Sequence, residues 1–246
     1  MTEYARYAIY YMPDPSGGLW RDGSAWLGRD AFGGEGVARP ALEALASLNT
    51  DRLTAGPRHY GFHGTLKAPF EPAEGVTTAG LLRAVEDFAS RRPAFDIALE
   101  VATLGDFVAL RPSERVEDGD DDPMRDLHWD CVHELDRFRA PISDADLQRK
   151  RKARLTPDQD AYLVQWGYPY IFDQFRFHMT LTSRIACKGS QSTIADALTG
   201  FLEVHTATPH RASGLGLYAQ VDRDAPFDVL AWCPLGGGET QRSPRA

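Results

Sequence analysis

The fold is decided by a tetrapeptide pattern that the chain carries twice, as His63-Gly64-Thr65-Leu66 and as His178-Met179-Thr180-Leu181. The two copies begin 115 residues apart, at 63 and 178. Around each copy, apolar and polar residues alternate with a period of two, which is typical of a β-strand with one buried face. By chance, two such motifs occur in roughly one chain in a thousand. The repeat therefore predicts two related half-molecules.

The segments that follow each motif repeat as well. After the first motif, the patterns predict a helix near 77–88 and strands at about 95–101 and 107–111. After the second, they predict a helix at about 192–204 and strands at about 214–221 and 227–232. We therefore expect an α+β protein with two pseudo-symmetric antiparallel-sheet lobes, helices outside and a central cleft.

The chain is expected to form a single bilobal domain over residues 1–235 of its 246. Lobe one would span about 1–112 and lobe two about 126–235, joined by an acidic linker at 113–125. The Gly-rich tail, 236–246, is predicted to be disordered.

Further predictions concern segments outside the repeat. The aromatic run at 4–12 indicates a strand, and Pro40 indicates a helix that starts there. Residues 14–36, rich in Gly, Pro and Asp, are interpreted as a long ordered loop in which Trp20 and Trp26 could form a lid or a stacking platform, with no functional role as the alternative. Helices are also expected at about 124–138 and 157–166.

Composition narrows the range of partners. The formal net charge is −8, so a large nucleic acid is not an expected partner, whereas a small phosphate ester could still bind in a locally basic pocket. The sequence begins without the pattern of a signal peptide and contains no apolar run long enough for a membrane helix, which predicts a cytoplasmic protein with no membrane partner. The three cysteines have no metal-ligand spacing, and we expect neither a metal nor a cofactor.

The residue types on the polar face of each motif indicate phosphoryl chemistry. Alternate side chains on one strand face lie about 6.5–7 Å apart. An imidazole can accept or donate a proton near neutral pH, and a threonine hydroxyl can donate to a phosphoryl oxygen. His63 and His178 are therefore the candidate catalytic acid and base, and Thr65 and Thr180 are candidate phosphate ligands. The sequence leaves open which histidine is the base.

Several other residues could contact a substrate. Lys67, Arg176 and Arg184 share the strand faces of the histidines and could bind phosphate, whereas Tyr168 could stack against a base or ribose. The basic run from 149 to 154 is interpreted as a solvated helix face, with the attraction of an anionic substrate as the alternative.

The two motifs resemble those of the two-histidine (2H) phosphoesterase superfamily, which includes RNA-ligase-like proteins and cyclic phosphodiesterases. The longer strings at 60–70 and 166–182 are similar to a branch of unknown function that is often encoded beside phosphonate-catabolism genes. The resemblance covers 4–235. It implies a bilobal fold, His63 and His178 as acid and base, and Thr65 and Thr180 as phosphate ligands.

Together, these features predict a metal-independent phosphoesterase that cleaves a small cyclic phosphodiester, either a ribose or a nucleoside cyclic phosphate. Hydrolysis and ligation both remain open, as does the oligomeric state. A non-catalytic nucleotide or phosphate sensor, or an accessory protein of phosphonate metabolism, is the alternative. Pure binding needs hydrogen-bond donors but no pair of groups that transfer protons near pH 7, which favours the enzyme.

Overall fold

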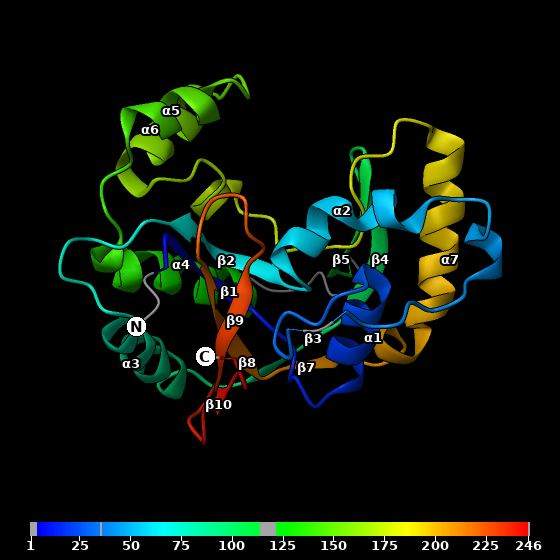
Figure 1. Cartoon of the computed structure of the whole chain (residues 1–246), viewed down its shortest axis with the longest axis horizontal. Helices are drawn as coiled ribbons and strands as arrows, with labels where there is room; N and C mark the ends of the chain where they lie inside the picture. The colour runs from blue at the N-terminus through cyan, green and yellow to red at the C-terminus, as the bar shows by residue number, and fades with distance from the viewer. Residues whose placement is uncertain (1–3, 35, 114–121, 246) are drawn as a thin grey trace.

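The computed structural model describes residues 4–34, 36–113 and 122–245. It is an α+β protein built on an antiparallel sheet (Figure 1). Its strand order is β10-β9-β8-β1-β2-β6-β5-β4. The strands are β1 (Arg6–Tyr11), β2 (Gly64–Phe70), β4 (Leu99–Leu104), β5 (Phe107–Pro112), β6 (Met179–Thr180), β8 (Gly214–Gln220), β9 (Asp228–Pro234) and β10 (Gln241–Arg242). Two short strands, β3 (Phe95–Ile97) and β7 (His210–Ala212), pair with each other separately.

Helices pack against different parts of this sheet. α3 (Thr78–Ser90) contacts β8 and β9, α4 (Pro123–Leu135) contacts β2, and α7 (Lys188–Thr206) contacts β4 and β5. α1 (Gly18–Leu27) packs against α7 and against α2 (Thr50–Tyr60). α5 (Asp144–Arg151) and α6 (Pro157–Trp166) form a pair that projects from the molecule at the upper left of Figure 1. Among the described residues, no helix combines the length and the apolar character needed to cross a bilayer.

The strands of the two sequence halves are interleaved in the sheet. β4 and β5 follow the first motif in sequence, yet β5 pairs with β6, the strand of the second motif. Likewise, β8 follows the second motif but pairs with β1, which in turn pairs with β2. The structure thus differs from the expected lobe boundaries at 112 and 126, because each half contributes strands to the other. Most of the acidic linker lies outside the described residues, and its last part, from Pro123, already belongs to α4.

Residues 14–36 contain a helix where a loop was expected. α1 buries Leu19, Trp20, Trp26 and Leu27, whose spacing places them on one helical face. The indole N–H of Trp26 donates to the carbonyl of Leu181 at 2.8 Å, next to the second motif. The prediction of a loop was wrong because the glycines in and around the helix, among them buried Gly23, obscured this period. The tryptophans are core residues, so the lid interpretation was wrong too.

Other observed helices and strands begin or end at residues that differ from the predicted ones. The helix expected from Pro40 is a short 3₁₀ turn, η1 (Glu43–Leu45), and the regular helix, α2, starts at Thr50. The Asn49 side chain caps α2 by accepting from the backbone N–H of Arg52. The tail predicted to be disordered carries β10, which pairs with β9. The predictions for the strand at 4–12 and the helix at 157–166 agree with β1 and α6.

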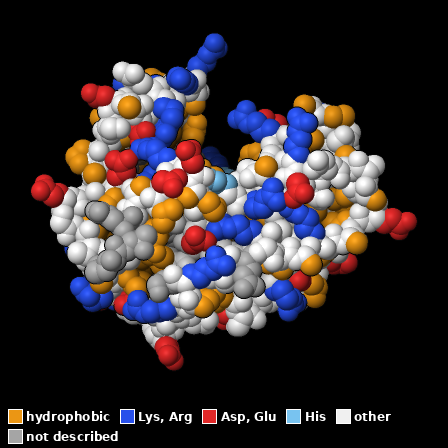
Figure 2. Space-filling model, in the orientation of Figure 1, with side chains coloured by type: hydrophobic (Ala, Val, Ile, Leu, Met, Phe, Trp, Pro, Cys, Tyr) orange, Lys and Arg blue, Asp and Glu red, His pale blue; other side chains and the backbone are white. Residues whose placement is uncertain are grey.

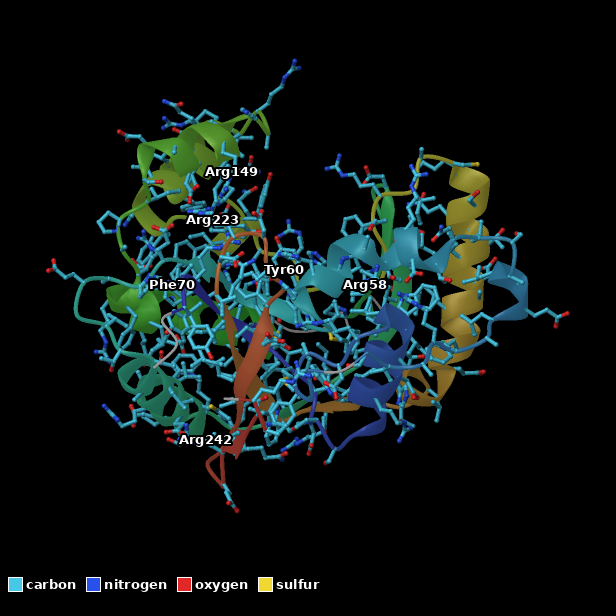
Figure 3. The ribbon with its side chains drawn as sticks, viewed as in Figure 1. Arg58, Tyr60, Phe70, Arg149, Arg223 and Arg242 are labelled. Atoms are coloured by element: carbon cyan, nitrogen blue, oxygen red, sulfur yellow. The ribbon has the colours of Figure 1, made fainter. Side chains whose placement is uncertain are left out.

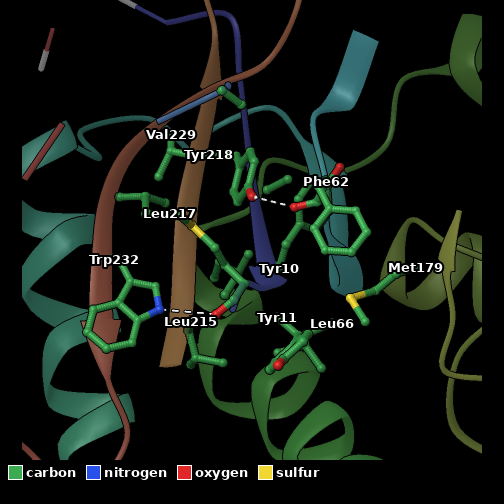
Figure 4. Packing of buried hydrophobic residues seen from close by; sticks show 14 of the residues in the cluster. Tyr10, Tyr11, Phe62, Leu66, Met179, Leu215, Leu217, Tyr218, Val229 and Trp232 are labelled. Carbon is green, nitrogen blue, oxygen red and sulfur yellow. Dashed lines mark hydrogen bonds between the residues drawn. The ribbon is translucent and has the colours of Figure 1, made fainter. Parts of the chain in front are cut away.

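The core is built on the strands at the centre of the sheet (Figure 4). Tyr10, Tyr11 and Tyr218 are each at most 1% exposed. The Tyr218 hydroxyl donates to the carbonyl of Phe62, just before the first motif, and the Trp232 N–H donates to the carbonyl of Met12. These bonds satisfy buried polar groups; the first links β8 to the segment before β2, and the second links β9 to the end of β1.

Candidate active site

The two motifs lie side by side at the centre of the sheet. β2 and β6 pair antiparallel, and the residue opposite Gly64 is Met179. These are the two central residues of the His-x-Thr motifs. An antiparallel register with this pair places His63 opposite Thr180 and Thr65 opposite His178. All four side chains therefore share one face of the sheet, and the local twofold axis passes between Gly64 and Met179.

This arrangement sets the distances within the site. Side chains directly opposite have Cβ atoms about 4.5–5.5 Å apart, and diagonal neighbours are about 7–8 Å apart. The two histidines are diagonal neighbours, as are the two threonines. The space between the imidazoles is therefore of the size of one phosphoryl group with its oxygens.

Gly64 allows this close pairing. A Cβ atom placed on it would lie 2.4 Å from a ring atom of Phe177, the residue before His178. The side chain of Phe177 packs under Gly64, opposite the histidine face. The difference between the two motifs, Gly in one and Met in the other, thus has a steric cause.

Both imidazoles are oriented in the same way. Nδ1 of His63 donates to the carbonyl of Gly61 at 2.9 Å, and Nδ1 of His178 donates to the carbonyl of Arg176 at 2.7 Å. In each motif the acceptor lies two residues before the histidine. A proton fixed on Nδ1 leaves the Nε2 lone pair of the neutral ring available. The Thr65 hydroxyl lies 3.4 Å from Nε2 of His63.

The surroundings of the two histidines differ. The ring of Tyr10 stacks on His63 with centroids 3.9 Å apart. Desolvation lowers the pKa of His63 to about 4; the Gly61 carbonyl opposes this shift and the charge of His178 adds to it. His63 is therefore neutral at pH 7. His178 is partly exposed and has Phe107 beside it, with ring centroids 5.6 Å apart.

Two adjoining cavities open onto this face. A cavity of about 520 Å³ is lined by His63, Thr65, Thr180 and Tyr168, among others. A smaller one, of about 260 Å³, is lined by His178, Arg176, Thr65 and Tyr168. Thr65 and Tyr168 line both cavities, so the two cavities adjoin between the histidines. Figure 2 shows a hollow at the top of the molecule, between the α5–α6 projection at the upper left and the right-hand part. Histidine atoms, in pale blue, lie at the bottom of this hollow.

Lys67 does not lie on the histidine face, so its assignment as a phosphate ligand was wrong. Tyr10 pairs with Thr65 but Ile9 pairs with Lys67, so Leu66 is an extra residue in β2. This β-bulge breaks the period of two and turns Lys67 toward α4. Its Nζ forms an ion pair with Asp136 at 2.8 Å, and its side chain is 5% exposed.

The remaining candidates lie around the cavities. Arg176 is exposed and lines the smaller cavity, although its guanidinium donates to the carbonyls of Asp173 and Phe175. Tyr168 lines both cavities, and its role as a substrate contact stays a prediction. Arg184 lines the larger cavity beside Asp106, with its side chain 87% exposed.

Sequence reasoning missed two residues that shape the site. Tyr10 covers His63, and buried His128 donates from Nδ1 to the carbonyl of Leu66 at 2.8 Å while its Nε2 accepts from the backbone N–H of Phe172. The contact of Tyr10 depends on strand pairing across more than 50 residues, for which the local pattern carries no signal. Among the described residues, no group of three or more His, Cys, Asp or Glu side chains has the arrangement of a metal site.

Fold and site define an α+β protein with a duplicated His-x-Thr motif at the centre of an antiparallel sheet. Residues 65–228 match the model of a family described as a protein of unknown function (DUF1045), and the chain belongs to this family. It is also similar to two longer proteins, each named ribose 1,5-bisphosphate phosphokinase PhnN.

The relative from Laribacter hongkongensis (strain HLHK9) is 35% identical over 241 residues, which cover 97% of this chain and 54% of the relative. The relative from Janthinobacterium sp. (strain Marseille) is 37% identical over 181 residues, which cover 73% of this chain and 39% of the relative. The chain thus spans about half the length, or less, of the curated relatives that it matches.

Proposed function

We propose that this protein is a phosphoesterase of the two-histidine type, with a bilobal fold around the histidine face. Its substrate would be a small cyclic phosphodiester, a ribose or nucleoside cyclic phosphate. The observation that carries the proposal is the pairing of Gly64 with Met179, which brings two imidazoles and two threonine hydroxyls to one face.

The environments of the histidines support a division of roles. His63, neutral at pH 7 and with Nδ1 protonated, offers Nε2 as the base that takes a proton from the attacking water or hydroxyl. His178, diagonal to it, protonates the leaving oxygen on the other side of phosphorus, as in-line displacement requires. The hydroxyls of Thr65 and Thr180 donate to the non-bridging oxygens. Both proton transfers are thus assigned to side chains, and the mechanism needs no metal.

The relatives support a substrate that contains phosphorylated ribose. Their printed name refers to ribose 1,5-bisphosphate, and a role beside such an enzyme in phosphonate metabolism agrees with the gene context that the resemblance implies. Their name also makes a phosphokinase the second candidate. Against it, the pattern G-x-x-x-x-G-K-[ST] of the P-loop does not occur in the 246 residues.

The first test compares His63→Ala and His178→Ala with the wild-type protein on a panel of ribose and nucleoside cyclic phosphates. We expect each variant to lose about 10²–10⁴-fold in kcat, the usual contribution of general acid–base catalysis. His133→Ala is the matched control, since this exposed histidine of α4 lines neither cavity. Circular dichroism verifies that the variants fold.

Four outcomes would decide against the proposal, two of them in favour of an alternative function. Tight binding of cyclic phosphates without turnover would favour the sensor, and ATP-dependent phosphorylation of ribose 1,5-bisphosphate would favour the kinase. A strict loss of activity with EDTA that zinc or magnesium restores would overturn the proposed mechanism. Normal turnover by both histidine variants would overturn the assignment of the site.

A further inference from the structure

A strongly basic pocket continues the histidine site along β2. This pocket, of about 410 Å³, shares Tyr60, Ala68, Pro69 and Tyr168 with the larger cavity of the site. Its walls contain Arg6, Arg139, Arg149, Lys150 and Arg223, against the carboxylates Glu71 and Asp146. The charged lining residues thus have a cationic excess in a protein whose formal net charge is −8.

The cations come from separate parts of the chain. Arg6 belongs to β1, Arg149 and Lys150 to α5, and Arg223 to the turn between β8 and β9. Arg223 bridges Glu71 at 2.5 Å and Asp146 at 2.9 Å, which ties this turn to α5. Figure 3 shows Arg149 and Arg223 close together on the side of the α5–α6 projection, with Tyr60 between them and the centre of the molecule.

Two of these cations make contacts with uncharged groups. Nε of Arg6 donates to the side-chain oxygen of Gln220 at 2.7 Å, and Nζ of Lys150 donates to the carbonyl of Gly167 at 2.6 Å. Lys150 also lies 5.5 Å from the centroid of the Tyr168 ring. These contacts hold Arg6 and Lys150 in place and are not ion pairs, whereas Arg139, Arg149 and Arg223 each form an ion pair with a carboxylate.

The cations also repel one another. Desolvation lowers the pKa of Lys150 to about 8; Asp146 opposes this shift, and Arg149 and Arg6 add to it. Such a group of like charges, partly removed from water, costs folding free energy, and a bound anion would offset that cost. This is the pattern of a binding site rather than of a solvated surface.

We propose that the basic pocket binds a second phosphoryl group of the same substrate molecule, so that the preferred substrate is a cyclic phosphodiester that carries a further phosphate. The inference rests on the proposed function of the histidine site. Thr65 and Pro69 lie about 13 Å apart along β2. The long Arg and Lys side chains reach back toward the histidine site, so the two bound phosphates would lie closer together than this distance. The two phosphates are therefore separated by a ribose or a nucleoside, as in a 5-phosphorylated cyclic ester, rather than directly joined.

The residues shared by the basic pocket and the larger cavity could contact the ribose or nucleoside between the two phosphates. Tyr60 and Tyr168 line both cavities and present aromatic surface between the histidines and the cations. Aromatic rings stack on sugars or bases without demanding one particular base. The combined cavity is of a size typical for a single small ligand.

The experiment compares adenosine 2′,3′-cyclic phosphate with its 5′-phosphorylated form. We expect kcat/KM to be about tenfold to a hundredfold higher for the phosphorylated ester, the usual value of one or two hydrogen bonds to charged groups. In Lys150→Met, which keeps the apolar stem over Tyr168, and in Arg149→Ala, this preference should shrink, mainly through KM. The control is Lys152→Met, since Lys152 is exposed at the end of the same helix and does not line the pocket.

A binding measurement separates this proposal from the proposed function. Isothermal titration with ribose 5-phosphate needs no turnover, and binding should weaken about tenfold or more in Lys150→Met but not in Lys152→Met. If no cyclic ester is turned over while this pattern holds, the phosphoesterase fails and the anion pocket stands. If both esters are cleaved equally well and Lys150→Met matches the wild-type protein in both assays, the anion pocket is refuted and the phosphoesterase stands.

Discussion

Replacing Lys67 distinguishes the observed structure from the simple strand pattern. A period of two would place this lysine beside the histidines, as a phosphate ligand. The structure buries it against Asp136, 2.8 Å away, with side-chain exposures of 5% and 22%. Lys67→Met keeps the apolar stem and removes the charge. The change should therefore reduce stability and leave substrate binding nearly unaltered.

The magnitude follows from what remains around Asp136. Breaking a buried ion pair by removing one partner costs about 3–5 kcal/mol. Asp136 keeps its two hydrogen bonds from Arg139, at 2.9 and 3.0 Å, so we expect about 3 kcal/mol, at the lower end of this range. With a urea dependence of about 3 kcal/mol per molar, the unfolding midpoint should fall by about 1 M.

The assay combines urea unfolding followed by fluorescence with kcat/KM for a cyclic phosphate. Arg151→Met is the control, because Arg151 forms an exposed ion pair with Asp160 and its loss should change stability by less than about 0.5 kcal/mol. A Lys67→Met protein with an unchanged midpoint and a tenfold higher KM would refute the reasoning, since it would place the lysine on the substrate side of β2.

Three further predictions concern the histidines and their packing. Desolvation lowers the pKa of His128 to about 4, below its usual 6.5, so the unfolded chain binds a proton more readily. The contribution of His128 to the free energy of unfolding is therefore fully present above about pH 6.5. About 3 kcal/mol of it is lost as the pH falls toward 4. Urea midpoints should therefore fall less steeply with acid in His128→Gln than in the wild-type protein, and equal slopes would contradict the prediction. If His63 is the base, kcat/KM should decrease as the pH falls through about 4, the pKa of this histidine. Tyr10→Ala admits water to the imidazole ring and should move this decrease toward about pH 6.5. A pH profile that does not move would show that Tyr10 does not shield His63 from water. Gly64→Ala would place a Cβ atom 2.4 Å from Phe177, so we expect a loss of about 1–3 kcal/mol and of about tenfold in kcat/KM; full stability and full activity would contradict the observed pairing of β2 with β6.

The sequence was sufficient to predict the elements that contain a complete local signal. The helix at 157–166 has Thr156 and Gln159 as a capping box at its start and Gly167, with φ of 75°, at its end. The repeated tetrapeptide predicted that two strands would expose His and Thr on one face. It could not predict that these strands would pair directly, because the register depends on residues 115 apart (63 to 178).

The errors have non-local causes. The bulge at Leu66 exists because β1 pairs with β2 in a shifted register, and neither strand alone shows it. The interleaving of the halves also depends on which edges meet, so strands that follow one motif complete the sheet beside the other. The cations of the basic pocket come from four segments, and only the run from 149 to 154 was visible as a cluster in the sequence.

The asymmetry of the site follows from its twofold arrangement. The strands that flank the central pair are β1 on one side and β5 on the other. Opposite Thr65 the flanking residue is Tyr10, and at the equivalent position opposite Thr180 it is Ala109. The phenol ring of Tyr10 covers the neighbouring His63, with ring centroids 3.9 Å apart. The methyl group of Ala109 is too small to cover His178 in the same way. The two His-x-Thr motifs thus acquire different environments from one pair of neighbours. The proposed mechanism needs that difference, because one imidazole must accept a proton while the other donates one.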